Sequence, residues 1–180
     1  MSINKKKKSA GKAILAWIIV LAILAAGVLV FVSVFYEDAK KKLDEMNYPR
    51  TYSTYVEKAA KDYDLDPALI YAVIHTESGF DPKAESGVGA KGVMQMMPSS
   101  FEWLQEQRGC AGQYTEDDLF DPEICIDYGS YLLKYFYDYY GTERSAIAAY
   151  NAGFVVSDWL NDTNYSSDGK NLDSIPYPET

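Results

Sequence analysis

Histidine and cysteine are scarce in this sequence. Its 180 residues include one histidine, His75, and two cysteines, Cys110 and Cys125. Zinc sites usually need three or four such ligands, and neither a second histidine nor a paired thiol lies near His75 in the sequence. The order G-x-x-x-x-G-K-[ST], which binds nucleotide phosphates, is also absent. We therefore interpret His75 as a structural or surface residue and expect no metal and no cofactor.

Basic side chains are in short supply outside the N-terminus. The formal net charge is −9, yet residues 1–36 hold five lysines and no acidic residue. The rest of the chain therefore holds 12 of the 17 basic residues and all 26 acidic ones. A nucleic-acid partner needs a basic surface that neutralises its phosphates. We expect no nucleic-acid partner, and a large partner that is neutral or mixed in charge.

One long apolar run lies near the N-terminus. Residues 13–32 form this run of 20 residues, and a helix of that length spans about 30 Å, the hydrocarbon thickness of a bilayer. We interpret it as an uncleaved transmembrane signal anchor; a cleaved signal peptide, whose apolar region is usually shorter, is the alternative. The lysines before it place the N-terminus in the cytoplasm. The chain is then a single-pass cell-membrane protein with its larger part outside the cytoplasm.

Capping residues and helical spacing divide the remaining chain into helices. We expect a first helix from about Ser53 to Tyr63, a second from Pro67 with Asp66 as its N-cap, and a third from Pro98 to Gly109. A fourth is expected from Pro122, capped by Asp121, to Gly141, and two short ones in ERSAIAAYNAG and VVSDWL. Little is typical of strand, so the fold class is mainly α. The expected organisation is a cytoplasmic basic tail (1–12), a transmembrane anchor (13–35), a juxtamembrane stalk (36–52), a folded domain (53–161) and an irregular tail (162–180).

A glutamate continues the apolar stripe of the second expected helix. Glu77 follows Ile70, Val73 and Ile74 at helical spacing, which would leave its carboxyl partly desolvated. It also lies near the helix C-terminus, where the macrodipole disfavours another negative charge. Both effects raise a carboxyl pKa, as a general acid working near neutral pH requires. The alternative is that the helix frays and leaves Glu77 exposed.

The two cysteines lie in the part of the chain expected to face outward, where thiols tend to oxidise. One disulfide between Cys110 and Cys125 would close a short loop and contribute roughly 3 kcal/mol in the chain-entropy model. Two free buried thiols are the alternative.

A long motif begins at the same glutamate. The stretch ESGFDPKAESGVGAKGVMQMMP, residues 77–98, resembles the signature of the soluble lytic transglycosylase domain in the lysozyme-like superfamily. LFDPEICIDYGSYLL and AIAAYNAG are similar to two later elements of that family, and the resemblance covers about residues 53–160. Three positions depart from the family pattern: Val93 replaces Leu, Ser100 replaces a frequent Thr, and Cys125 replaces Asn. We expect the disulfide to substitute for that Asn.

The resemblance implies a goose-type, lysozyme-like helical domain that acts on peptidoglycan glycan strands. Glu77 would serve as the only general acid and base when the MurNAc-(β1,4)-GlcNAc bond is cleaved with formation of 1,6-anhydro-MurNAc. Two alternatives are a hydrolytic muramidase of the goose type and a wall-binding scaffold without turnover. Protein partners cannot be inferred from the residues.

The resemblance also assigns roles to the residues around Glu77. Ser86 and Gln95 would line the sugar site, Tyr150 and Asn151 would lie near the catalytic carboxyl, and Tyr150 would orient it by a hydrogen bond. Phe80, Met94 and Met97 would form apolar walls, whereas Asp81 and Glu85 would lie on the loop surface. An aromatic stripe on the long helix is interpreted mainly as core; its members are Tyr128, Tyr131, Leu132, Tyr135, Phe136 and Tyr139.

Overall fold

The computed structural model describes residue 17 and residues 26–37 and 51–176. Contacts between Cα atoms divide the chain into two units, Met1–Pro49 and Arg50–Thr180. In the first unit, residues 26–37 are helical and exposed. None of the helices within the described ranges is long and apolar enough to cross a membrane. Most of the expected anchor, together with the basic tail and residues 38–50 of the expected stalk, lies outside these ranges.

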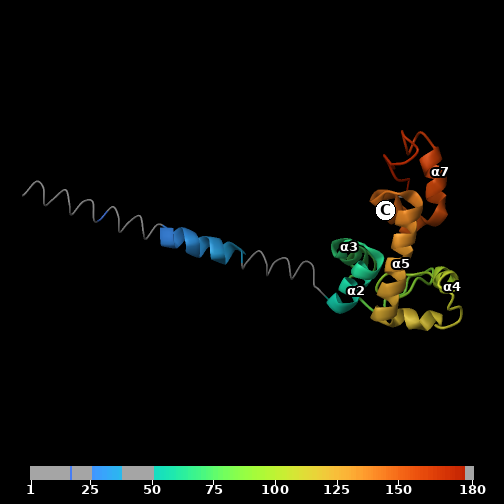
Figure 1. The fold of residues 1–180 in the computed structure, drawn as a ribbon, viewed down its shortest axis with the longest axis horizontal. Helices are drawn as coiled ribbons and strands as arrows, with labels where there is room; N and C mark the ends of the chain where they lie inside the picture. Colours follow the sequence, from blue (N-terminus) through green and yellow to red (C-terminus); the bar gives the residue numbers. More distant parts are fainter. Residues whose placement is uncertain (1–16, 18–25, 38–50, 177–180) are drawn as a thin grey trace, which may run out of the picture. The chain divides into compact units, whose positions relative to one another are not determined.

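The second unit is built from helices, as the sequence predicts (Figure 1). Their bounds are α2 Ser53–Tyr63, α3 Pro67–Ser78, α4 Pro98–Gln107, η1 Glu116–Phe120, α5 Pro122–Tyr140, α6 Glu143–Ala152, η2 Gly153–Val155 and α7 Val156–Asn161. No strand is found within residues 51–176, where β pairing is limited to the isolated bridges Glu85–Lys91 and Lys91–Met96. The mainly α class is therefore confirmed.

Local capping explains why two of the helices begin where they do. The Asp66 carboxylate accepts a hydrogen bond from the Ala68 N–H at 2.8 Å, and Pro67 takes the first position of α3. Asp121 caps α5 in the same way through the Glu123 N–H at 2.8 Å. These carboxylates satisfy backbone donors that a helix leaves unpaired at its N-terminus. Both predicted starts are confirmed.

Helix α5 runs through the middle of the unit, with α2 on one side and α4 on the other (Figure 1). Tyr128, Leu132 and Phe136 on this helix are buried, so the core interpretation of the aromatic stripe is confirmed for them. Tyr139, at the end of the same stripe, is 58 % exposed. The stripe therefore leaves the core before the helix ends.

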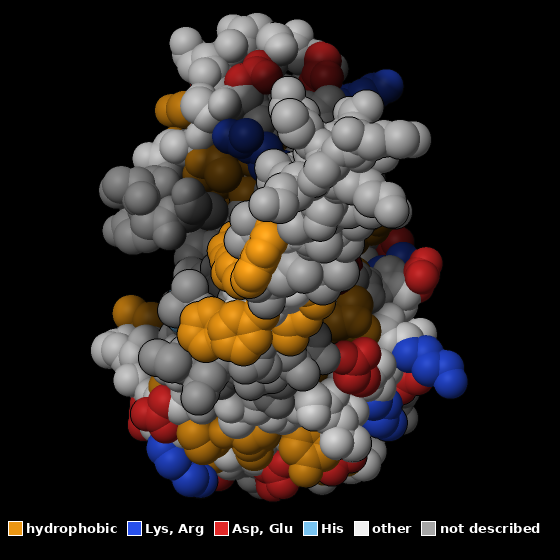
Figure 2. Space-filling model, turned by 90° about the vertical axis from the view of Figure 1, so that its left-hand side faces the viewer, with side chains coloured by type: hydrophobic (Ala, Val, Ile, Leu, Met, Phe, Trp, Pro, Cys, Tyr) orange, Lys and Arg blue, Asp and Glu red, His pale blue; other side chains and the backbone are white. Residues whose placement is uncertain are grey.

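The segment after α7 lacks regular structure but packs against the helices. Leu172 and Ser166 are buried, and Arg144 on α6 donates a hydrogen bond to the Asp173 carbonyl at 3.2 Å. Figure 2 shows one face of the molecule, on which the described acidic and basic side chains are interspersed rather than gathered by sign.

Candidate active site

A pocket of about 290 Å³ contains Glu77. It lies where the end of α3, the loop after it, the start of α4, the middle of α5 and the end of α6 meet. Its lining residues are Glu77, Ser86, Val88, Ala90, Gln95, Met96, Met97, Ser100, Leu132, Tyr150 and Asn151. Within this lining Glu77 is the only ionisable carboxyl.

Glu77 sits in the last turn of an intact helix. Helix α3 continues to Ser78, and Gly79 ends it in the left-handed conformation, with φ 60°, while its N–H bonds to the His75 carbonyl at 3.0 Å. Fraying before Glu77 is therefore excluded, and the stripe of Ile70, Val73 and Ile74 is buried as predicted.

Partial burial raises the pKa of the Glu77 carboxyl above its ordinary value. The physical cause is desolvation, which penalises the charged form. Among the ion pairs of the described residues, none involves Glu77, so no cation offsets this effect there. The carboxyl is thus suited to hold a proton at a pH where an exposed glutamate has lost it.

The loop between α3 and α4 is held by hydrogen bonds to its own backbone. The Ser78 hydroxyl donates to the Val93 carbonyl at 2.8 Å, which ties the end of α3 to the far side of the loop. The Gln95 side-chain amide donates to the carbonyls of Ala84 and Gly92, each at 3.0 Å. Gln95 therefore enters the pocket from a fixed position.

Lys91 fastens the same loop to η1, a role that the sequence did not reveal. Its ammonium group lies 3.0 Å from both Glu116 and Asp117 and 5.4 Å from the centre of the Phe120 ring. Hydrogen bonds to Asp117 and Glu116 raise the pKa of Lys91. No local pattern joins residues 25 positions apart, so periodicity alone could not have found this contact.

Cys125 lies beneath the loop rather than in a disulfide. Both cysteines are free thiols. The Cys125 sulfur accepts a hydrogen bond from the Met94 N–H at 3.4 Å and donates to the Lys91 carbonyl at 3.8 Å, while the Cys110 sulfur lies 3.2 Å from the Tyr128 hydroxyl. The expected disulfide is thus absent, because each sulfur faces a different partner. Burial raises the pKa of Cys125 to about 12, so the thiol stays neutral.

Tyr150 supports the pocket through the backbone. Its hydroxyl donates to the Met94 carbonyl at 2.7 Å, so its single proton is not directed to Glu77 as the sequence analysis expected. Burial raises the pKa of Tyr150 well above its ordinary value, and Cys125 and Glu77 add to this effect in their ionised forms. The phenol is therefore a neutral donor that fixes the loop close to the acid.

The structure brings six of the eight predicted site residues together. Glu77 shares its pocket with Ser86, Gln95, Met97, Tyr150 and Asn151. Phe80 instead packs near the rings of Tyr71 and His75, with centroids 6.5 and 6.1 Å away. Met94 is fully buried. Neither of these two lines the pocket, so their predicted role as its walls is wrong.

Five residues that line the Glu77 pocket were not predicted from the sequence: Val88, Ala90, Met96, Ser100 and Leu132. Among them, Val88 lies in the glycine-rich loop and is 79 % exposed, but a single exposed apolar residue is common on protein surfaces and does not mark a site by itself.

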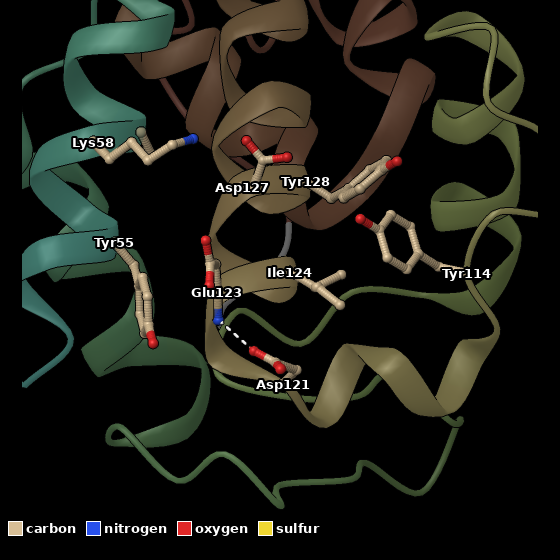
Figure 3. Close-up of a pocket in the computed structure, with 9 residues that line it drawn as sticks. Tyr55, Lys58, Tyr114, Asp121, Glu123, Ile124, Asp127 and Tyr128 are labelled. Carbon is tan, nitrogen blue, oxygen red and sulfur yellow. Dashed lines mark hydrogen bonds between the residues drawn. The ribbon is translucent and has the colours of Figure 1, made fainter.

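A larger pocket, of about 420 Å³, lies between α2 and α5 and shares no lining residue with the Glu77 pocket (Figure 3). Its carboxylates are largely engaged by the protein. Asp121 caps α5, and Asp127 accepts hydrogen bonds from Tyr63 at 2.5 Å and Arg108 at 2.6 Å. Within the described residues, no group of three or more His, Cys, Asp or Glu could hold a metal ion. The smaller pocket is therefore the candidate active site.

Comparisons with known proteins show to which family this chain belongs. The profile of the Transglycosylase SLT domain matches residues 54–172. The chain is 32 % identical over 139 residues to the soluble lytic murein transglycosylase of Escherichia coli (strain K12), a match that covers 76 % of this chain and 22 % of that protein. It is 39 % identical over 111 residues to membrane-bound lytic murein transglycosylase C of Sodalis glossinidius (strain morsitans), covering 57 % of this chain and 31 % of the relative.

Two solved structures of lytic transglycosylases are also similar to this chain. The 70 kDa soluble lytic transglycosylase from Escherichia coli matches with a TM-score of 0.63 and 31 % identity over 67 % of this chain and 20 % of that one. Lytic transglycosylase Slt from Pseudomonas aeruginosa was solved as an inactive glutamate-to-glutamine mutant. It matches with a TM-score of 0.61 and 32 % identity, over 67 % of this chain and 20 % of that one. The chain spans about a fifth of the length of these soluble relatives.

Proposed function

This chain belongs to the Transglycosylase SLT domain family, and from that premise we propose that it is a peptidoglycan lytic transglycosylase. Its substrate would be the MurNAc-(β1,4)-GlcNAc bond and its product a 1,6-anhydro-MurNAc end. The observation that carries the proposal is one partly buried carboxyl with a raised pKa, Glu77, in a pocket whose other lining residues are uncharged. A relative that a glutamate-to-glutamine change inactivates is in keeping with it.

Glu77 acts first as the acid. Its carboxyl donates its proton to the glycosidic oxygen, so that the bond to the anomeric carbon of MurNAc breaks and the GlcNAc end leaves with a new hydroxyl. The apolar neighbours in the pocket, among them Met96 and Leu132, favour the neutral acid before this step because they exclude water.

Glu77 then acts as the base. The carboxylate takes the proton of the C6 hydroxyl of MurNAc, and that oxygen attacks the anomeric carbon of the same sugar. The new ring bond gives the 1,6-anhydro product, Glu77 ends protonated as it began, and no water is consumed. One carboxyl therefore completes the cycle.

The positive charge that develops on the sugar in the transition state must be stabilised without a second carboxylate. Glycosidases that use two carboxylates hold them about 5 to 9.5 Å apart, whereas Asp81 and Glu85 do not line this pocket. The acetamido group of the substrate and the polar side chains of Ser86, Gln95 and Asn151 would serve instead. Gln95 is pre-oriented by its two hydrogen bonds, which reduces the reorganisation needed during the reaction.

The pH dependence should report the raised pKa of Glu77. Turnover needs the acid form, so kcat/KM should fall as pH rises through a pKa above the ordinary glutamate value.

The same shift affects stability. Because the folded state disfavours the charged form, the contribution of Glu77 to the free energy of unfolding of wild type should fall as pH rises from its unfolded-state pKa to its folded-state pKa. Glu77→Gln removes that loss. The Tm of the variant minus that of wild type should therefore increase with pH in thermal melts, and a difference independent of pH would contradict the assignment.

Two other readings of the same pocket are separated by their products. A hydrolase would release fragments with reducing ends, since water would take the place of the C6 hydroxyl. A wall-binding scaffold would retain insoluble peptidoglycan and release nothing. Digestion of purified peptidoglycan with the full chain, followed by mass analysis of the soluble fraction, distinguishes all three.

We also propose that residues 13–32 anchor the chain in the cytoplasmic membrane, with the N-terminus inside. The support is the length and apolar character of this run, and some relatives are named membrane-bound lytic murein transglycosylase C. After extraction of membranes with alkaline carbonate, the full chain should stay in the pellet, whereas a variant lacking residues 1–36 should be released. Recovery of the full chain in the supernatant, or a mature form that begins after the run, would contradict an uncleaved anchor.

A further inference from the structure

Four aromatic side chains form a cluster at the surface, which we call the aromatic shelf: Trp103, Tyr135, Tyr139 and Phe154. Phe154 is its centre, with ring centroids 6.5 Å from Trp103, 6.3 Å from Tyr135 and 5.6 Å from Tyr139. The shelf is open to solvent, because Phe154 is 49 % exposed and Tyr139 is 58 % exposed. Exposed rings gathered in one place often mark a binding surface.

The shelf starts one helical turn away from the Glu77 pocket. On α4, Trp103 follows the pocket residue Ser100 by three positions, and on α5, Tyr135 follows Leu132 by three. Residues at this spacing are neighbours on one face of a helix.

The third approach comes from α6. The pocket residue Asn151 lies near the end of this helix, and Phe154 follows three positions later in η2. Gly153 ends α6 between these two residues, so here the link is closeness along the chain rather than a shared helix face. Together with the helical neighbours on α4 and α5, it places the shelf beside the pocket.

The rings are arranged so that Phe154 is fixed. Its plane makes angles of 87° with Trp103, 88° with Tyr135 and 79° with Tyr139. Aromatic pairs favour such edge-to-face contacts, which position a ring beyond what burial alone achieves. A ligand that stacks on the shelf would therefore meet a surface that is already ordered, and little binding free energy would be lost in ordering it.

The size of the pocket suggests what the shelf is for. Its volume of about 290 Å³ is at the lower limit of ligand pockets, which usually hold about 300 to 1,000 Å³. A glycan strand is a polymer, so its other sugar rings must lie on the surface next to the pocket. The shelf contributes no charged side chain, which suits a neutral pyranose ring whose C–H groups pack on aromatic faces, and its Trp and Tyr members add hydrogen-bonding groups at their edges.

We propose that the aromatic shelf is a sugar-stacking subsite that holds a pyranose ring of the glycan strand beyond the rings bound in the Glu77 pocket. The identity of that strand rests on the proposed function. The shelf would tighten binding of long strands and would leave the chemical step at Glu77 unchanged.

The test compares Phe154→Ala with Tyr137→Ala in the full chain. Tyr137 is a matched control, because it too is an exposed ring, at 39 %, but it lies on α5 and is not a member of the shelf. On long peptide-free glycan strands, Phe154→Ala should raise KM about tenfold, equivalent to about 1.4 kcal/mol of binding, with kcat unchanged. Both variants should match wild type on a tetrasaccharide substrate, and Phe154→Tyr, which keeps the ring, should restore the KM.

Equal losses on long and short substrates, together with a lower Tm, would mean that Phe154 only supports the fold, and they would overturn the proposal. If Phe154→Ala does not fold, Tyr139→Ala replaces it, because this ring is the most exposed of the four shelf side chains. Phe154→Ala in a Glu77→Gln background should weaken binding to long strands about tenfold. This binding is measured by co-sedimentation of the protein with immobilised strands.

The binding measurement separates this proposal from the proposed function. If the wild-type chain cleaves nothing while Phe154→Ala still weakens binding, the proposed function fails and the shelf stands. If wild type cleaves glycan and Phe154→Ala binds and cleaves long strands as wild type does, the shelf fails and the proposed function stands.

Discussion

Glu77→Gln should lower kcat on peptidoglycan by about 10²- to 10⁴-fold, the range that a positioned acid or base contributes. Glutamine keeps the shape of the side chain but can neither give up a proton to the glycosidic oxygen nor take one from the C6 hydroxyl. No other carboxyl lines the pocket to replace it. The measurement is kcat for release of soluble fragments at a pH where wild type is fully active.

The matched control is Glu85→Gln. Glu85 is a nearby glutamate in the loop that follows α3, but it is exposed and does not line the pocket, so the kcat of this variant should equal that of wild type. Thermal melts should show that Glu77→Gln is folded and, above the folded-state pKa of Glu77, more stable than wild type, because the desolvated charge is gone. Retained turnover in a folded Glu77→Gln chain would remove Glu77 from the mechanism.

Gly92→Ala should destabilise the protein by about 3 kcal/mol, from left-handed backbone strain and overpacking together. Gly92 has φ +77°, and a Cβ built there would lie 2.0 Å from the Leu119 carbonyl oxygen and 2.9 Å from the Cys125 sulfur. The carbonyl belongs to the backbone of η1, so it cannot move without disturbing the segment that holds Lys91. Chemical denaturation of the variant and wild type measures the difference.

Gly89→Ala is the control for backbone strain alone. Gly89 also has a positive φ, +88°, but no heavy atom lies within 4 Å of a Cβ built on it. This variant should lose only about 1 kcal/mol, the strain of a left-handed alanine. Equal losses for the two variants would show that the close approach of Gly92 to η1 does not matter.

Most helices could be predicted because their signals are local. A capping carboxylate followed by proline acts on the next turn of the chain, and Gly141 at φ 75° ends α5 where the sequence placed its terminator. The partial burial of Glu77 was predicted for a similar reason, since its position relative to Ile70 and Val73 depends only on the helical repeat, whereas its catalytic role was inferred from the family resemblance.

The features that were missed depend on contacts between distant segments. Phe80 has a positive φ, 71°, and its ring packs near Tyr71 and His75 on α3 instead of lining the pocket. Met94 is buried where a Cβ on Gly129 would come within 2.6 Å of its sulfur. Such pairings, like the separate partners of the two cysteines, follow from the packing of segments that are distant in the sequence and have no periodic signature.

In the proposed reaction Glu77 directs the C6 hydroxyl, and not water, to the anomeric carbon. The direct measurement is mass spectrometry of the fragments that the full chain releases from purified peptidoglycan in water enriched in heavy oxygen. The proposed reaction predicts fragments that end in 1,6-anhydro-MurNAc, lighter by one water than the reducing form and free of the heavy isotope. Reducing ends that carry heavy oxygen from the first turnover would contradict it and identify a hydrolase on the same fold.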